Sequence, residues 1–297
     1  MNQPNSTWNT PLDDELYKPD EEAIEFFATA TGISDREELK QHILRVQTKA
    51  FKEFPYPCIR VFEFMKLKLA RLPVYQQFLE LGKSRKGGIF LDLGCCFGND
   101  SRKAVMDGWP VENVLASDLQ SKFWEYGHEL FISTPETFPA RFVPGDIFDP
   151  KFLEEHEPFT NPPSSLAPTL DQVRSDKSLN GLRGHVSAVF TGAFSHLFDE
   201  EKQAEVARKL AGLLSPEPGS MLIGVQGGRK KKGLFEPSIN GKKEYRMFCH
   251  SEKTWKELWE GPLDFFGTFP GNSEQYQLIK WSVTRMQSNS SSLKGEV

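Results

Sequence analysis

Apolar residues recur at helical spacing through the first quarter of the chain. Between Glu21 and Lys52 they mark one face of a helix, with a second start at Ser34-Asp35, and the segment Phe54-Pro-Tyr-Pro57 ends the pattern. Two further helices are predicted over 58–71 and 73–82. This part of the chain is therefore expected to be helical throughout.

Beyond it, short apolar runs of strand type alternate with helical segments. The runs lie, in chain order, at 89–94, 113–118, 140–146, 186–191 and 220–225. The clearest helix covers 199–214, with Asp199 as a candidate N-cap. Buried strands that alternate with helices predict a parallel sheet covered on both faces. Two last strands, near 263–269 and 277–284, have a short loop between them and predict an antiparallel pair at the sheet edge.

Composition narrows the class of protein. The chain has 297 residues, 38% of them hydrophobic, and a formal net charge of −5. A weakly acidic chain is a poor nucleic-acid binder. Its apolar runs are far shorter than the ~20 residues that span a bilayer, and its first residues have neither the basic nor the apolar region of a secretory signal. Four cysteines, two of them adjacent, make no disulfide framework and favour a reduced, cytoplasmic protein.

The strongest candidate for a binding site follows the first strand. The segment Leu91-Asp-Leu-Gly-Cys-Cys-Phe-Gly98 leads into a helix at about Asp100. Gly94 allows a tight turn, and Gly98 allows close approach of a ligand or of the helix. A dinucleotide site would need a third glycine where Cys96 stands. The acid Asp92 would repel phosphates, so the turn suits a neutral ligand or one with an ammonium group.

Two more acids stand at the ends of the next two strands. Asp118 is placed to accept hydrogen bonds from both hydroxyls of a ribose. Asp146 could accept the exocyclic amine of an adenine, with Ile147 packed on the ring. Because three acids end three successive strands in this order, the sequence predicts a nucleoside-type ligand.

These motifs resemble those of the class I S-adenosylmethionine-dependent methyltransferases, over about 87–284. A narrower likeness is to fungal natural-product methyltransferases, a group that includes enzymes that methylate a carboxylic acid in meroterpenoid biosynthesis. It rests on five segments: Phe54-Pro-Tyr-Pro-Cys58, Phe90-Leu-Asp-Leu-Gly-Cys-Cys-Phe-Gly98, Ser117-Asp-Leu119, Asp146-Ile-Phe148 and Ala193-Phe-Ser-His-Leu-Phe198. The sequence departs from the group in a Pro-rich insertion at 157–180 and a basic loop near 229–232.

The resemblance implies an α/β fold with a doubly wound, seven-stranded, mostly parallel sheet. The predicted organisation is a helical lid over 1–86, a core over 87–286 that contains the insertion 157–180, and a flexible tail over 287–297. S-adenosyl-L-methionine is the implied cofactor, with Asp92 on its ammonium directly or through water and the Gly94-Cys95 backbone beside its methionine part. The cofactor-binding residues so predicted are Asp92, Gly94, Cys95, Gly98, Asp118, Leu119, Asp146 and Ile147.

The acceptor side is predicted from fewer residues. His196 follows the fourth strand, where this fold places methyl transfer, and is either a catalytic base or substrate contact or a packing histidine. Phe194 is expected beside it. Tyr56, between two prolines, either lines the site from the lid or holds the N-terminal helices together.

Other candidates have a plainer interpretation. Cys95 and Cys96 have no partners at ligand spacing, so packing beside the cofactor is favoured and no metal site is predicted. Trp255 and Trp259 are expected in the core, and the loop 229–232 on the solvated surface.

The sequence therefore predicts a methyltransferase for a small hydrophobic metabolite, acting as a monomer or homodimer without nucleic acid or a membrane span. A carboxylate is the favoured acceptor, because it is already ionised at pH 7 and needs no base. The alternatives are a phenol, enol or amine acceptor, and a non-catalytic cofactor-binding partner protein.

Overall fold

The core of the molecule is a seven-stranded sheet in the order β10-β11-β5-β4-β1-β2-β3. The computed structural model describes residues 10–236, 238–239, 242–243, 246–259, 264–266 and 277–286. The strands of the sheet are β1 (Ile89–Leu93), β2 (Val114–Asp118), β3 (Arg141–Pro144), β4 (Val186–Gly192), β5 (Met221–Gly228), β10 (Asp264–Phe266) and β11 (Gln277–Thr284).

Six strands of the sheet run in one direction, and β11 runs in the opposite direction. β3, β2, β1, β4 and β5 pair in parallel, whereas β11 pairs antiparallel with both β5 and β10. The strand order reverses between β1 and β4, so the carboxyl ends of these two strands flank the crevice in which open α/β sheets bind ligands. The predicted doubly wound sheet with an antiparallel edge is confirmed.

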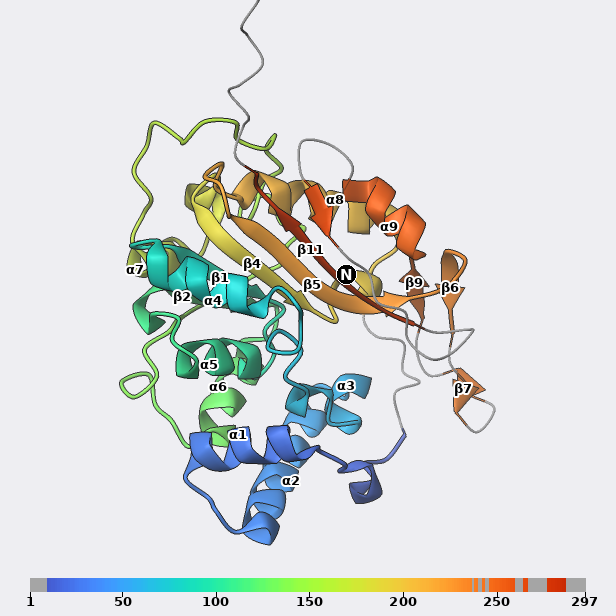
Figure 1. The fold of residues 1–297 in the computed structure, drawn as a ribbon. Coiled ribbons are helices and arrows are strands. Elements are labelled where there is room, and N and C mark those ends of the chain that lie inside the picture. The colour runs from blue at the N-terminus through green and yellow to red at the C-terminus, as the bar shows by residue number, and fades with distance from the viewer. Residues whose placement is uncertain are drawn as a thin grey trace, which may run out of the picture.

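Helices cover both faces of the sheet (Figure 1). One face packs on α7 (Leu170–Asp176), α8 (Glu200–Leu213) and α9 (Glu252–Trp259), and the other on α4 (Tyr75–Ser84), α5 (Asn99–Met106) and α6 (Ser121–Leu130). Side chains alternate across a strand, so Leu91 and Leu93 of β1 belong to the first core and Phe90 to the second. Asp92 therefore points toward α5.

A third apolar cluster joins the N-terminal helices to α6. These helices are α1 (Glu21–Thr31), α2 (Arg36–Glu53) and the short α3 (Pro57–Arg60), and Figure 1 shows them together at the end of the molecule near α5 and α6. Phe27 stacks on Phe131 with ring centroids 5.0 Å apart, and Phe123 also lies in this cluster. The region 1–86 divides between two clusters, because α4 packs on the sheet with the second core.

Two predictions about local structure are wrong. The helix expected over 58–71 is only α3 followed by one 3-10 turn, Glu63–Met65. Phe62 has a φ of 56°, and a non-glycine residue in this left-handed region interrupts a helix. The Pro-rich insertion 157–180, interpreted from the sequence as a surface segment between two elements, contains a helix, α7: Thr169 caps its N-terminus, and Val173 is buried against the sheet.

Two other predictions are confirmed. Trp255 and Trp259 are buried and contact Trp281 of β11, with ring centroids 5.3 and 5.1 Å away. Residues 230–232 of the basic loop are exposed. The predicted tail 287–297 lies outside the described residues. In the part of the chain that the structure describes, no helix is long and apolar enough to cross a membrane.

Candidate active site

The turn between β1 and α5 is built on three left-handed residues. Gly94, Cys96 and Gly98 have φ values of 74°, 51° and 70°. The N–H groups of Gly94 and Cys95 both donate to the carbonyl of Ser117 on β2, at 2.8 and 3.1 Å. A Cβ on Gly94 would lie 2.6 Å from the ring of Phe194. Glycine is therefore required here by both the backbone and the neighbouring ring.

Asp92 and Asp100 are buried on the two sides of this turn. Asp92 accepts a hydrogen bond from the Ser101 hydroxyl at 2.6 Å, and Asp100 accepts the N–H of Leu69 at 2.9 Å. Burial, and then the charge of Asp100, raise the pKa of Asp92 to about 7. Burial also raises the pKa of Asp100. Two carboxyls held in this state attract a cation.

Asp118, at the end of β2, is oriented by the backbone on both sides. Its Oδ2 accepts the N–H of Cys96 and its Oδ1 the N–H of Gln120, each at 2.9 Å. Burial raises the pKa of this carboxyl, and the backbone hydrogen bonds oppose that rise. The bond to Cys96 also holds the left-handed turn, so the acid of β2 and the turn of β1 form one unit.

The residues predicted to contact an adenine differ in exposure. Leu119 is 45% exposed beside Asp118, whereas Ile147 is buried in the core and its carbonyl accepts the ammonium of Lys209 at 2.8 Å. Asp146 Oδ1 accepts the N–H of Phe148 at 3.0 Å. The N–H of the adjacent Gly145 donates to the carbonyl of Asp118 at 3.2 Å, which ties the ends of β2 and β3 together.

The end of β4 carries strained backbone and a buried histidine. Ala193 has a φ of 57°, which costs a non-glycine residue of the order of 1 kcal/mol. His196 is buried, and its Nδ1 accepts the N–H of Gly227 on β5 at 2.9 Å. A backbone N–H can only donate, so Nδ1 is unprotonated and the ring proton of the neutral histidine lies on Nε2. Burial lowers the pKa of His196 to about 4.

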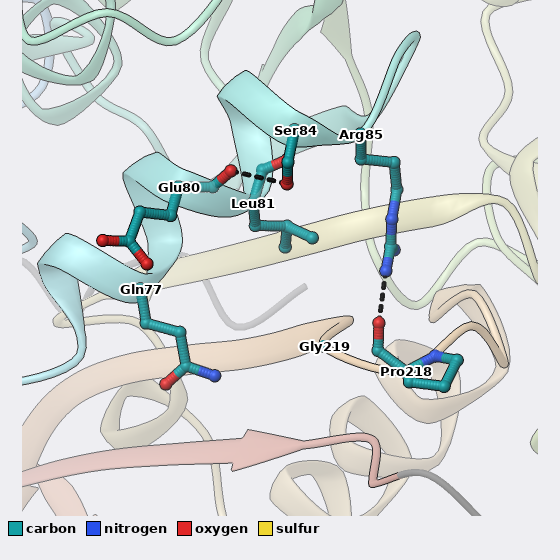
Figure 2. Close-up of a pocket in the computed structure, with 7 residues that line it drawn as sticks. All are labelled: Gln77, Glu80, Leu81, Ser84, Arg85, Pro218 and Gly219. Carbon is teal, nitrogen blue, oxygen red and sulfur yellow. Dashed lines mark hydrogen bonds between the residues drawn. The ribbon is translucent and has the colours of Figure 1, made fainter.

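One surface hollow of about 470 Å³ lies elsewhere (Figure 2). It is lined from α4 and from the loop before β5, and Arg85 donates a hydrogen bond across it to the carbonyl of Pro218. These segments lie at the amino ends of β1 and β5. The hollow is therefore at the amino ends of the strands, whereas Asp92, Asp118 and His196 lie at or after the carboxyl ends.

Sequence comparison places the chain among fungal enzymes. A family model described as the meroterpenoid methyltransferase N-terminal domain matches residues 11–65. The methyltransferase AusD of Aspergillus calidoustus is 31% identical over 231 residues, which cover 77% of this chain and 72% of that protein. The O-methyltransferase PhiE of a fungal species is 30% identical over 253 residues, 85% of this chain and 73% of that protein.

The chain belongs to this family of fungal methyltransferases. It is a class I S-adenosylmethionine-dependent enzyme of secondary metabolism, as its motifs predicted. Among solved structures, a glycopeptide N-methyltransferase with bound S-adenosylhomocysteine matches 70% of this chain and 87% of its own, with 15% identity and a TM-score of 0.44.

The site of this methyltransferase suits the charge of its cofactor. S-adenosylmethionine carries a sulfonium and an ammonium group. Asp92, Asp100 and Asp118 lie on the three segments that meet at the turn, and none of them forms an ion pair among the described residues. Buried carboxyls without a cation are costly, so a cationic ligand satisfies a need that the protein itself leaves open. In the described part of the chain, no group of three His, Cys, Asp or Glu could hold a metal ion.

The N-terminal segment of the methyltransferase reaches the ribose side of the site. Tyr56 packs on Phe123 at the start of α6, with ring centroids 5.6 Å apart. Burial, and then the charge of Asp118, raise the pKa of its hydroxyl, while a hydrogen bond to the Gln120 side chain opposes the rise. Tyr56 therefore lies beside the predicted ribose acid.

Three residues near the predicted site residues could not be found from sequence motifs. Ser101 orients Asp92, and the N–H of Gln120 orients Asp118. The third is Lys68, whose Cδ lies 3.7 Å from where a Cβ on Gly192 would be, at the end of β4. The only sequence signal for Ser101 was its place on the first turn of a helix after the glycine turn. Lys68 stands in no motif at all.

Proposed function

We propose that this methyltransferase transfers a methyl group to a carboxylate oxygen of a small hydrophobic metabolite. The observation that carries the proposal is the protonation state of His196. With Nδ1 bound to Gly227 and a pKa lowered to about 4, the ring is neutral and presents a donor, Nε2–H. Such a group can hold a carboxylate oxygen, but it is a weak base for a phenol of pKa ~10.

The chemistry supplied by the cofactor is a methyl group on a sulfonium. A carboxylate lone pair forms the new O–C bond, the C–S bond breaks, and its electron pair stays on sulfur as the thioether. No proton is released in this reaction, whereas a phenol or alcohol acceptor must release one. The protein aligns the two reactants and excludes water, which together account for most catalysis of this kind.

Each predicted residue has a place in this scheme. Asp92 faces the ammonium, Asp118 the ribose hydroxyls and Asp146 the adenine amine. Leu119 and Ile147 take the base by apolar contact and backbone. The Gly94–Gly98 turn, with Cys95, lies along the methionine part, and Phe194 closes over Gly94 between cofactor and acceptor.

The lid over 1–86 belongs to the same proposal, because Tyr56 already lies beside Asp118. The thiols of Cys58, Cys95, Cys96 and Cys249 are free, which supports a reducing, cytoplasmic setting.

The test is a competition between matched acceptors. The protein is incubated with S-adenosylmethionine labelled in the methyl group and an equimolar set of hydrophobic acids, phenols, enols and amines. Mass spectrometry identifies the methylated product, and a pH indicator in weak buffer counts protons released per turnover. A methyl ester formed with no proton released supports the proposal. A methylated phenol, enol or amine with one proton released contradicts it, and no product with any class, despite cofactor binding, supports a non-catalytic partner.

A further inference from the structure

Lys68 lies against the end of β4, although it comes from the N-terminal segment. The next residue, Leu69, is fixed by its hydrogen bond to Asp100 on α5. The side chain of Lys68 is 15% exposed, and its Cδ approaches Gly192, four positions before His196. The chain therefore delivers a lysine to the edge of the sheet where methyl transfer is expected.

The ammonium of Lys68 shares its nearest carboxylate with a second lysine. It donates to the carbonyl of Glu63 at 2.6 Å and lies 3.6 Å from the Glu63 carboxylate. The same carboxylate forms a closer ion pair with Lys66. Two lysines share one glutamate, so Glu63 alone does not neutralise both. An ammonium has three donors, and a separation of 3.6 Å is too long for a hydrogen bond, which leaves a donor for a ligand.

The charge of Lys68 faces the space between the segments of the site. It opposes the rise that burial causes in the pKa of Cys58 on α3 and of Cys96 and Asp100 at the turn after β1, and it adds to the fall that burial causes in the pKa of His196 after β4. Lys68 is therefore close to residues of three separate segments. This agrees with the contacts to Gly192 and, through Leu69, to Asp100.

We propose that Lys68 binds a carboxylate in the active site. Three buried acids, Asp92, Asp100 and Asp118, surround this edge of the sheet and would repel any carboxylate that entered without a cation beside it. Arg102 is the other buried cation near the turn, but aromatic rings enclose it, with Phe138 4.1 Å from its guanidinium carbon. Lys68 is the one that reaches the ends of both β1 and β4.

Two carboxylates have this chemistry, that of the methionine part of the cofactor and that of an acid acceptor. The inference rests on the proposed function only for the second source. Both sources remain open to the test, because the turn after β1 is the proposed place of the methionine part and the end of β4 that of the acceptor.

Calorimetric titration of Lys68→Met separates the two sources. The first pair of probes is S-adenosylhomocysteine and 5′-methylthioadenosine, which lacks the carboxylate. The second pair, in saturating S-adenosylhomocysteine, is 2-naphthoate and its amide, 2-naphthamide. Loss of one charge-assisted hydrogen bond is expected to weaken the relevant carboxylate probe roughly tenfold or more. Its partner without a carboxylate should bind Lys68→Met and wild type alike.

Two variants serve as controls. Lys49→Met removes a lysine of α2 that pairs with Glu129 and contacts neither Glu63 nor Lys68, so it should leave all four probes unchanged. Lys68→Arg keeps the charge and should restore most of the lost affinity. Unchanged binding of both carboxylates in Lys68→Met overturns the proposal, as does equal weakening of S-adenosylhomocysteine and 5′-methylthioadenosine. If the wild-type enzyme esterifies no acid but Lys68→Met weakens S-adenosylhomocysteine selectively, the proposed function fails and the role of Lys68 stands.

Discussion

At the residue scale, the site depends on side chains whose oxygen atoms already accept hydrogen bonds from backbone N–H groups. Each oxygen of Asp118 accepts one N–H, and a carboxylate oxygen has a second acceptor position. The backbone therefore fixes the carboxylate, and we predict that its remaining lone pairs accept the hydroxyls of the ribose. The acid is held before the ligand binds, so little side-chain entropy is lost on binding.

Asp118→Asn tests this directly. The amide retains one acceptor oxygen but loses the charge and half of the acceptor positions. The affinity for S-adenosylhomocysteine is expected to fall tenfold to a hundredfold, the value of one hydrogen bond to a charged group, about 1.5–3 kcal/mol. Asp149→Asn is the matched control, because Asp149 makes the same bond to the N–H two residues on, Lys151, at 2.9 Å. Equal affinity of Asp118→Asn and wild type in calorimetry would show that Asp118 does not hold the ribose.

His196→Gln tests the donor role of the histidine. The glutamine can accept from Gly227 and still donate, so we expect measurable activity, with a loss of about tenfold to a hundredfold. Because the pKa of His196 is lowered to about 4, the ring is already neutral at pH 7 and its charge does not change between pH 7 and 9. At saturating S-adenosylmethionine, the rate profiles of wild type and variant should both be flat from about pH 7 to 9, where the carboxylate of the acceptor does not titrate either. A large loss that higher pH rescues would indicate a base and a phenol acceptor.

The sequence predicted the acids of the site because their positions follow from topology alone. Parallel strands end at one edge, so Asp118 and Asp146 had to approach the turn that follows Asp92. Lys68 and the protonation state of His196 could not be predicted. They depend on contacts across more than 30 positions, Leu69 with Asp100 and Gly227 with His196, which no local pattern records.

At the scale of elements, periodicity succeeded where burial is regular. The strands of the sheet and helices α1, α2 and α8 were predicted, because their apolar positions face one continuous core. The segment 58–71 failed, since its apolar residues point into a cluster of aromatic rings without helical geometry. α7 failed for the opposite reason: it buries one apolar side chain, Val173, and is held by a cap and the Arg141–Asp171 ion pair.

The segment 54–69 is the element that joins the lid to the site. Tyr56 lies beside Asp118 and Lys68 beside Gly192, so a bound cofactor would be covered by this segment. Amide hydrogen exchange across 54–69 is expected to slow when S-adenosylhomocysteine binds, because opening would then require loss of the ligand.

Helix α9, on the far face of the sheet, is the internal reference and should exchange at the same rate with and without ligand. Protection of the turn 94–98 without any change in 54–69 would mean that the N-terminal helices are a structural support and not a lid.

At the scale of the whole molecule, the site concentrates negative charge in a chain whose net charge is only −5. Burial raises the pKa of Asp92, Asp100 and Asp118, and the charges of the other two acids raise that of Asp92 further. A protein that holds carboxyls in this way is less stable without its ligand than with it. The affinity for the ligand and the free energy of unfolding therefore both depend on pH through these carboxyls.

The pKa of Asp92 sets the direction of this pH dependence. Its folded pKa, about 7, lies above the ~3.9 of an unfolded chain, so its stabilising contribution is complete below pH ~4 and is lost as pH rises through 7. The ammonium of the ligand favours the ionised form. From pH 6 to 8 the ionised fraction of a group with this pKa rises from about a tenth to about nine-tenths, and the affinity should rise roughly tenfold.

Saturating S-adenosylhomocysteine should therefore raise the melting temperature more at pH 8 than at pH 6. In Asp92→Asn, which can still accept from Ser101, the increment should be smaller and equal at both pH values. An equal increment at both pH values in the wild-type protein would show that Asp92 does not face the ammonium.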